Sequence, residues 1–331
     1  MSTKDMATDE AGARRRFPPS LVYQAARLYY LEQATQAEIA KQLGTSRPTV
    51  SRLLAEARDT GVVQVQVRDP EQTAMVDLEL ALVDALGLQR AYVTPASKGM
   101  PLGSLLGPGV AEALLDARLR PGDALLVSSG ATVYAVAQQA LPSLPGVVLC
   151  PTVGGVEEPE AQYQTNEITR GLAMKVDGSP VMLYAPAMPT PALHRVLLED
   201  PRLTRVTELW TSARAALLGI GGPPRHRSSL PSVISRTATA QSGAAGDICA
   251  RPCDRSGRPI KFPGVERLVA MNLADLRRIP HSIAAAVGQG KVQSILVAAR
   301  AGYFNTLVTD STTAEHLIDA AQDQPESPRD D

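Results

Sequence analysis

Two short stretches of the chain carry groups that could hold a negatively charged ligand. Residues 128–132 read Ser-Ser-Gly-Ala-Thr; they follow an apolar run and open a helical pattern. Backbone amides and hydroxyls at the start of a helix can bind a phosphate, assisted by the helix dipole. Lys291 follows Gly288 and Gly290 in a similar position, where a lysine opposes the helix dipole unless an anion is bound. The pattern favours an anion site, with a plain turn capped by Ser or Thr as the alternative.

Other residues in comparable places suit a ligand that carries several hydroxyl groups. Asp247 stands in a Gly-rich loop, where a carboxylate can accept hydrogen bonds from two hydroxyls of a polyol. Gln162 and Asn166 stand at a helix start, where capping and solvation explain them equally well. Gly154 and Gly155 either let the backbone approach a ligand or only form a turn. The candidate effector-binding residues are therefore Ser128, Ser129, Gly130, Ala131, Thr132, Gly154, Gly155, Gln162, Asn166, Asp247 and Lys291.

A second kind of chemistry, contact with DNA, is indicated by residues 35–58. Thr35 with Glu38 forms a capping box at the start of one short helix, and Gly44 follows that helix where a left-handed residue is expected. Ser46 then caps a second helix that has Pro48 in its first turn. Two short helices joined by such a turn are typical of a helix-turn-helix motif.

The second helix of this motif has one apolar face and one polar face. The apolar positions repeat at helical spacing and are expected to be buried: Val50, Leu53, Leu54 and Ala57. On the opposite face, arginines can reach guanine edges or phosphates, and hydroxyls can bond to bases or backbone. The candidate DNA-binding residues are Gln36, Ser46, Arg47, Pro48, Thr49, Ser51 and Arg52. An ordinary helical hairpin with a solvated polar face is the alternative.

Beyond residue 88, apolar strand patterns alternate with helical patterns. The candidate strands are residues 90–94, 123–128, 147–151, 180–185, 214–220, 266–271, 282–287 and 305–309. The candidate helices are residues 102–117, 132–141, 163–176, 191–198, 291–301 and 312–320. Such alternation predicts a parallel sheet covered by helices on both faces, a three-layer α/β/α domain. Ligands of open parallel sheets bind at the carboxyl ends of the strands, which is where most of the candidate effector residues fall.

The composition shifts along the chain predict its division into domains. We expect a disordered tail (1–17), a helix-turn-helix domain (18–70) whose valines at 62–67 form a β-wing, a linker helix (71–88), an effector domain (89–322) and a second disordered tail (323–331). The linker helix could dimerise or pack on the larger domain. The stretch 221–243, rich in Ser, Pro, Arg and Gly, is expected to be a functional or mobile loop.

Charge and cysteine content exclude several classes of protein. Residues 1–68 hold ten basic against seven acidic residues, and the remainder holds 23 against 27, as expected for a DNA reader with a separate effector domain. No apolar run could cross a membrane, and the N-terminus has no signal-peptide pattern, so we expect a cytoplasmic protein. Cys249 and Cys253 have no second Cys or His pair with zinc-site spacing, and no metal or cofactor is predicted.

Several separated segments resemble the SorC/DeoR-type sugar-binding transcriptional regulators. They include AEIAKQLGTSRPTVSRLLAEARDTGVV in the first domain, and VGGVEEPEAQYQTNEITRGLA, GAAGDICARPCDRSGRPI and LRRIPHSIAAAVGQGKVQSILVAARAGYFNTLVTDSTTA in the second. The resemblance implies a winged helix-turn-helix head on a body similar to sugar-phosphate isomerases and deaminases. It also implies an effector, usually a phosphorylated sugar, near the positions of Ser128–Thr132, Asp247 and Lys291. Ala131 brings no hydroxyl to this loop, so a neutral polyol is the alternative ligand.

The sequence thus predicts a DNA-binding regulator of a carbohydrate or polyol operon. Its expected partners are double-stranded operator DNA, a sugar, sugar phosphate or polyol, and further copies of itself. A dimer is the minimum for reading two half-sites, and the resemblance suggests a tetramer. The alternative is a sugar-phosphate isomerase or aminosugar deaminase fused to a DNA-binding head. It is disfavoured because none of the four histidines stands beside an acid at a predicted strand end.

Overall fold

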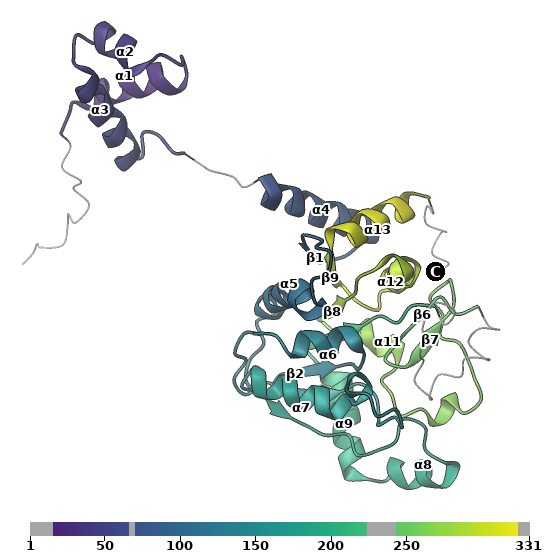
Figure 1. Cartoon of the computed structure of the whole chain (residues 1–331). Coiled ribbons are helices and arrows are strands. Elements are labelled where there is room, and N and C mark those ends of the chain that lie inside the picture. The colour runs from purple at the N-terminus through teal and green to yellow at the C-terminus, as the bar shows by residue number, and fades with distance from the viewer. Residues whose placement is uncertain (1–15, 66–69, 224–242, 324–331) are drawn as a thin grey trace, which may run out of the picture. The chain divides into compact units, whose positions relative to one another are not determined.

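The computed structural model describes residues 16–65, 70–223 and 243–323 of the chain. The chain divides into two compact units, unit 1 (Met1–Asp69) and unit 2 (Pro70–Asp331) (Figure 1). Among the described residues, no helix combines the length and the apolar character needed to cross a membrane.

Unit 1 is a small bundle of the helices α1 (Pro19–Tyr30), α2 (Gln36–Gln42) and α3 (Arg47–Asp59). The predicted capping box is confirmed, because Thr35 Oγ1 accepts from Glu38 N at 3.3 Å and Glu38 Oε2 accepts from Thr35 N at 2.8 Å. Gly44 has φ +61°, the left-handed conformation expected after α2. The core of the unit joins all three helices through Val22, Ala25, Ala26, Leu28, Ile39, Ala40, Val50, Leu53, Leu54 and Ala57.

The prediction of a β-wing after α3 is wrong for the residues that the structure describes. Residues 62–65 form no strand, and Val63 N donates to Ala57 O at 2.8 Å, which closes the end of α3 instead. Val67, the last valine of the predicted wing, lies outside the described residues. The tail expected at 1–17 lies outside them up to residue 15, whereas the amides of Arg16 and Phe17 donate to Glu56 Oε1.

Unit 2 is built on a sheet in which every paired strand is parallel. Its order is β1-β9-β8-β5-β2-β3-β4. The strands are β1 (Arg90–Thr94), β2 (Ala124–Val127), β3 (Val148–Pro151), β4 (Ser179–Pro180), β5 (Ala215–Gly219), β8 (His281–Ala285) and β9 (Thr306–Asp310). The central strands are built mainly of buried Ala, Val, Leu and Ile, since both faces of the sheet are covered.

Helices cover both faces of this sheet, which confirms the three-layer prediction. One face packs against α5 (Leu102–Asp116), α6 (Ala131–Ala137) and α7 (Thr165–Lys175), which lie side by side in Figure 1. The other face packs against α4 (Pro70–Leu86), α9 (Pro201–Ser212), α12 (Val292–Arg300) and α13 (Ser311–Asp323). Each face has its own apolar cluster, so the sheet separates two cores.

The helix α4, expected as a linker, packs within unit 2. Leu82 and Leu86 belong to one of its two cores, and Glu79 Oε1 accepts from Val93 N of β1 at 2.9 Å. The inner side of α4 therefore packs on the larger domain, which is one of the two alternatives given for this helix. Val76 and Leu80, on its outer side, remain exposed.

Shorter elements complete unit 2. They are the 3₁₀ turns η1 (Ala161–Tyr163), η3 (Val265–Arg267) and η4 (Gln289–Lys291), the helices α8 (Pro191–Leu198) and α11 (Leu273–Leu276), and a hairpin of β6 (Gly246–Ile248) with β7 (Arg251–Cys253). This hairpin, α11 and α9 were not predicted from the sequence. The start of α9 is marked by Asp200, whose side chain accepts from Arg202 N, followed by Pro201 at the first helical position, a signal typical of a helix start.

Two predicted strands are wrong in extent or in kind. The strand expected at 180–185 is reduced to β4, because after Val181 the side chain of Asn166 takes the backbone groups of Leu183. Residues 266–271 hold the end of η3 and one isolated bridge, from Ala270 to Val153. Their apolar side chains pack in a small separate cluster and in the core of unit 2, which satisfies burial without strand pairing.

Candidate functional site

The carboxyl end of the sheet contains a topological switch point between β2 and β5. From β2 the chain continues outward to β3 and β4, and from β5 it continues in the other direction to β8 and β9. The loops that leave two such strands diverge and open a crevice, which is the usual ligand position in open α/β sheets. The predicted effector residues can be placed relative to this crevice.

Ser128 fastens the two strands together at the switch point. Its Oγ accepts from Gly219 N at 2.8 Å and donates to Ser129 O at 3.3 Å, and the residue is 2% exposed. Its hydroxyl is therefore already used in holding the loop after β2 against β5. Ser128, which was predicted as a direct ligand contact, therefore has a structural role.

The loop after β2 leaves open space beside the backbone of Gly130. This glycine has φ +122°, and no atom lies within 4 Å of the position that a Cβ would occupy. Its amide donates to Gln162 O at 2.8 Å, so the predicted residues Gly130 and Gln162 are neighbours through their backbones. Ala131 and Thr132 begin α6, which has no side-chain cap, and Thr132 is buried.

The loop after β8 has a similar conformation on the other side of β5. Gly288 has φ +106° with open space at the Cβ position, and its amide donates to Thr313 Oγ1 at 2.9 Å. Lys291 closes η4 directly before α12, as the sequence predicted. A Cβ placed on Gly222 would lie 3.7 Å from Lys291 Cγ, so Lys291 lies beside the segment that follows β5.

Asp247 reaches the same segment from the β6–β7 hairpin. Gly221 N donates to Asp247 O at 2.9 Å, and Asp247 N donates to Gly221 O at 3.2 Å. The loop 128–132, Asp247 and Lys291 therefore converge on Gly219–Gly222, although they are far apart in sequence. We call this region the carboxyl-edge site.

Three other predicted residues have structural explanations. A Cβ on Gly154 would lie 2.6 Å from Ala185 O, so close backbone packing alone requires this glycine. Gly155 N donates to Ala185 O at 2.8 Å, which ties the turn to the same segment. Asn166 exchanges two hydrogen bonds with the backbone of Leu183, so both ends of its amide are occupied.

Sequence reasoning missed two buried hydroxyls near the ends of elements that lead to this site. Thr165 begins α7, is 2% exposed, and its Oγ1 has no hydrogen-bond partner among the described residues. Thr152 directly follows β3 and is fully buried, and its Oγ1 likewise has no hydrogen-bond partner among the described residues. The burial of a hydroxyl, rather than its sequence context, is the signal that identifies such candidates.

The predicted DNA-binding face of unit 1 is exposed as expected. Ser46, Arg47, Pro48, Ser51 and Arg52 are exposed on α3 and its cap, while the apolar stripe of the same helix is buried. Ser46 Oγ accepts from Thr49 N at 3.3 Å, so the cap fixes the start of this helix. A hollow of about 790 Å³ joins two predicted contacts, Gln36 and Arg47, and is also lined by Tyr29, Gln33, Ala34, Thr35 and Ala37.

Comparison with known proteins agrees with this arrangement. Residues 70–319 match a family model described as a sugar-binding domain, and residues 21–79 match a Crp-like helix-turn-helix domain. The chain is 32% identical to the sorbitol operon regulator of Klebsiella pneumoniae, over 90% of this chain and 97% of that protein. It is also 32% identical to the deoxyribonucleoside regulator of Bacillus subtilis (strain 168), with the same coverage. The crystal structure of the full-length sorbitol operon regulator SorC from K. pneumoniae matches with a TM-score of 0.67 and 30% identity, over 92% of this chain and 100% of that one.

A helix-turn-helix unit joined to a parallel α/β sugar-binding domain defines a DNA-binding transcriptional regulator. The chain belongs to the SorC family of these regulators. The similar proteins are named as regulators, and the enzyme alternative finds no support among them.

Proposed function

We propose that this regulator binds operator DNA through the exposed face of α3 and is controlled by a sugar or polyol effector at the carboxyl-edge site. The observation that carries the proposal is the convergence of the loop 128–132, Asp247 and Lys291 on Gly219–Gly222 at the switch point. The relatives named above regulate sorbitol and deoxyribonucleoside genes, which supports a polyhydroxylated effector here.

The groups at the site divide into two chemical roles in this proposal. Lys291 supplies a positive charge, and the backbone of the loop 128–132 supplies neutral donors, a combination that suits a phosphate. Asp247 supplies acceptors for the hydroxyls of the same ligand. A phosphorylated sugar would contact both kinds of group, whereas a free polyol would chiefly contact Asp247.

DNA recognition follows from the geometry of α3. Arg47, Thr49, Ser51 and Arg52 lie on the part of the helix that enters the major groove in helix-turn-helix proteins, and Gln36 lies at the start of the preceding helix. Two copies are needed to read two half-sites, so we propose a homodimer or a homotetramer. Effector binding would change the spacing of two helix-turn-helix units and thereby the affinity for the operator.

The proposal is tested by thermal unfolding of the full chain with sorbitol, sorbitol phosphate, deoxyribose and deoxyribose phosphate. An effector that binds the folded protein stabilises it against unfolding. One of these compounds, or a closely related one, should therefore raise the melting temperature in a concentration-dependent, saturable way. The same compound should change operator affinity in a titration at fixed salt. A compound that shifts the melting temperature but leaves operator affinity unchanged would contradict the regulatory role.

A further inference from the structure

A basic cavity lies at the amino end of the sheet, the end opposite to the carboxyl-edge site. Its volume is about 500 Å³, and its lining residues end or follow α5, or precede or begin strands: Arg90, Asp116, Ala117, Arg118, Arg120, Asp123, Arg214 and His281. Four of these eight residues are arginines, brought together from three separate parts of the sequence. We call this region the amino-edge pocket.

The carboxylates of the pocket are already engaged in local structure. Asp116 Oδ2 lies 3.3 Å from Arg90 Nη1 and accepts from Tyr92 Oη at 2.7 Å. Asp123 Oδ2 accepts from the backbone amide of Arg120 at 2.8 Å. Within the described part of the chain, the guanidinium groups of Arg118, Arg120 and Arg214 have no carboxylate partner. The pocket therefore holds an excess of positive charge.

The backbone of Arg118 provides an independent observation. Arg118 has φ +47°, the left-handed conformation, at the position just after the end of α5. Glycine is the residue favoured at this position, because a side chain there is strained. The chain instead places an arginine there, and Arg118 lines the basic pocket. Strain of this kind in a residue that lines a cavity is typical of functional sites.

His281 adds a further group that can become charged in the same pocket. It is partly buried at the start of β8, and burial together with the charge of Arg214 lowers its pKa, partly offset by Asp116. The backbones of the two residues are fixed together, because His281 N donates to Arg214 O at 3.2 Å. The positive potential that disfavours a proton on His281 would favour an anion.

The size and shape of the pocket indicate what kind of anion fits. It extends from the start of β1 to the start of β2, which are four strand spacings apart, or about 19 Å. Each guanidinium group can hold two phosphate oxygens, and the three arginines without a carboxylate partner in the described part of the chain lie before the neighbouring strands β2 and β5, an arrangement that suits more than one phosphate group. We propose that the amino-edge pocket binds a small molecule with two or more phosphate groups, at a site separate from that of the sugar effector.

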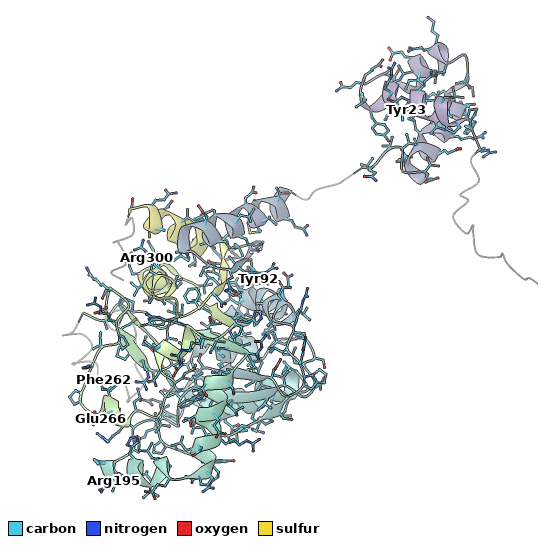
Figure 2. The ribbon with its side chains drawn as sticks, turned by 180° about the vertical axis from the view of Figure 1, so that it is seen from behind. Tyr23, Tyr92, Arg195, Phe262, Glu266 and Arg300 are labelled. Atoms are coloured by element: carbon cyan, nitrogen blue, oxygen red, sulfur yellow. The ribbon has the colours of Figure 1, made fainter. Side chains whose placement is uncertain are left out.

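The test is isothermal titration of the full chain with inorganic tripolyphosphate at constant ionic strength. We expect saturable binding of one tripolyphosphate per chain, weakened about tenfold or more in Arg118→Gly and Arg214→Gln. The matched control is Arg195→Gln, since Arg195 is an exposed arginine on α8; Figure 2 shows it at the opposite end of unit 2 from Tyr92, which contacts Asp116. A second control, Lys291→Gln, reports binding at the carboxyl-edge site.

Several outcomes would overturn the proposal. The first is the absence of saturable tripolyphosphate binding. The second is an equal loss of tripolyphosphate affinity in Arg195→Gln. The third is a loss of this affinity in Lys291→Gln while Arg118→Gly retains it. Dissociation of an oligomer by Arg118→Gly and Arg214→Gln in sedimentation, with tripolyphosphate affinity unchanged, would show instead that the pocket is an interface between copies. Arg118→Gly relieves backbone strain, so its folding is expected to be intact, and a melting curve verifies this.

Discussion

The side chain of Asn166 pairs with the backbone of Leu183 as a neighbouring strand would. Asn166 Nδ2 donates to Leu183 O at 3.1 Å, and Leu183 N donates to Asn166 Oδ1 at 3.0 Å. The pair fastens the start of α7 to the segment that follows β4, so the two regions that flank the end of β3 are held together. Asn166 is thereby explained by the fold alone.

Asn166→Ala is expected to lower the free energy of unfolding by about 1–3 kcal/mol, because both backbone groups of Leu183 lose their partner. Denaturant titration measures this loss. Glu167→Ala is the control, since Glu167 is exposed and its carboxylate pairs with Arg170 on the same helix. The affinity for the effector should stay within twofold of that of the unchanged chain. A large loss of effector affinity with unchanged stability would return Asn166 to the ligand contacts.

Arg52→Ala is expected to weaken operator binding by about 1–3 kcal/mol and to relax sequence preference if Arg52 contacts a base. Arg52 is exposed on α3, so its removal leaves no cavity. Leu53→Ala on the same helix should instead destabilise unit 1 by about 2–5 kcal/mol, because Leu53 is fully buried. Gel-shift titration at fixed salt and thermal unfolding separate the two effects. Unchanged operator affinity in Arg52→Ala would mean that another face of unit 1 binds DNA.

Lys291→Ala is expected to raise the dissociation constant of a phosphorylated effector about ten- to a hundred-fold, the value of one charged hydrogen bond. Operator affinity without effector should be unchanged. Thr132→Ala should have a milder effect, since backbone amides remain. Lys261→Ala, which removes an exposed lysine from another loop, is the control. Tight binding of a free polyol that Lys291→Ala leaves intact would exclude the phosphate role.

Gly154→Ala and Gly155→Ala form a matched pair at one turn. A Cβ at position 154 meets Ala185 O at 2.6 Å, whereas one at position 155 meets the same atom at 3.8 Å. Gly154→Ala should therefore cost about 1–3 kcal/mol of stability, and Gly155→Ala should cost little. Melting curves of the two variants test this. Equal stability of the two variants would contradict the close backbone approach at Gly154.

The three cysteines are expected to be unreactive in the folded protein. Burial raises the pKa of Cys150, Cys249 and Cys253 to about 12, so each thiol stays protonated at pH 8. Above pH 9.0, the ordinary pKa of a thiol, the unfolded chain loses thiol protons that the folded chain keeps. The free energy of unfolding therefore falls as the pH rises above this value. Thiol labelling should require unfolding, and stability should fall as the pH rises from 9 to about 12. Rapid labelling of the native chain at pH 8 would contradict the burial of these groups.

The sequence by itself determined those features that depend on neighbouring residues. The capping box of Thr35 and Glu38, the turn at Gly44 and the buried stripe of α3 follow from helix geometry and local hydrogen bonding. The order of apolar strands and helices likewise required a parallel sheet with two covered faces, since such strands cannot face water. The position of Lys291 before a helix at the carboxyl edge followed from that order.

The tertiary structure alone decided which distant residues meet. Asp247 lies beside Gly221 because the β6–β7 hairpin folds back onto the end of β5. Asn166 meets Leu183 because the Asn166 side chain makes the backbone hydrogen bonds that a neighbouring strand would otherwise make. Arg118 and Arg214 share one pocket because β5 and β2 are neighbours in the sheet. Strand order arises from packing and crossover connections between segments far apart in the chain, and local residue patterns carry no record of those contacts. For the same reason, apolar runs at 180–185 and 266–271 were predicted as strands, although packing rather than pairing buries their side chains.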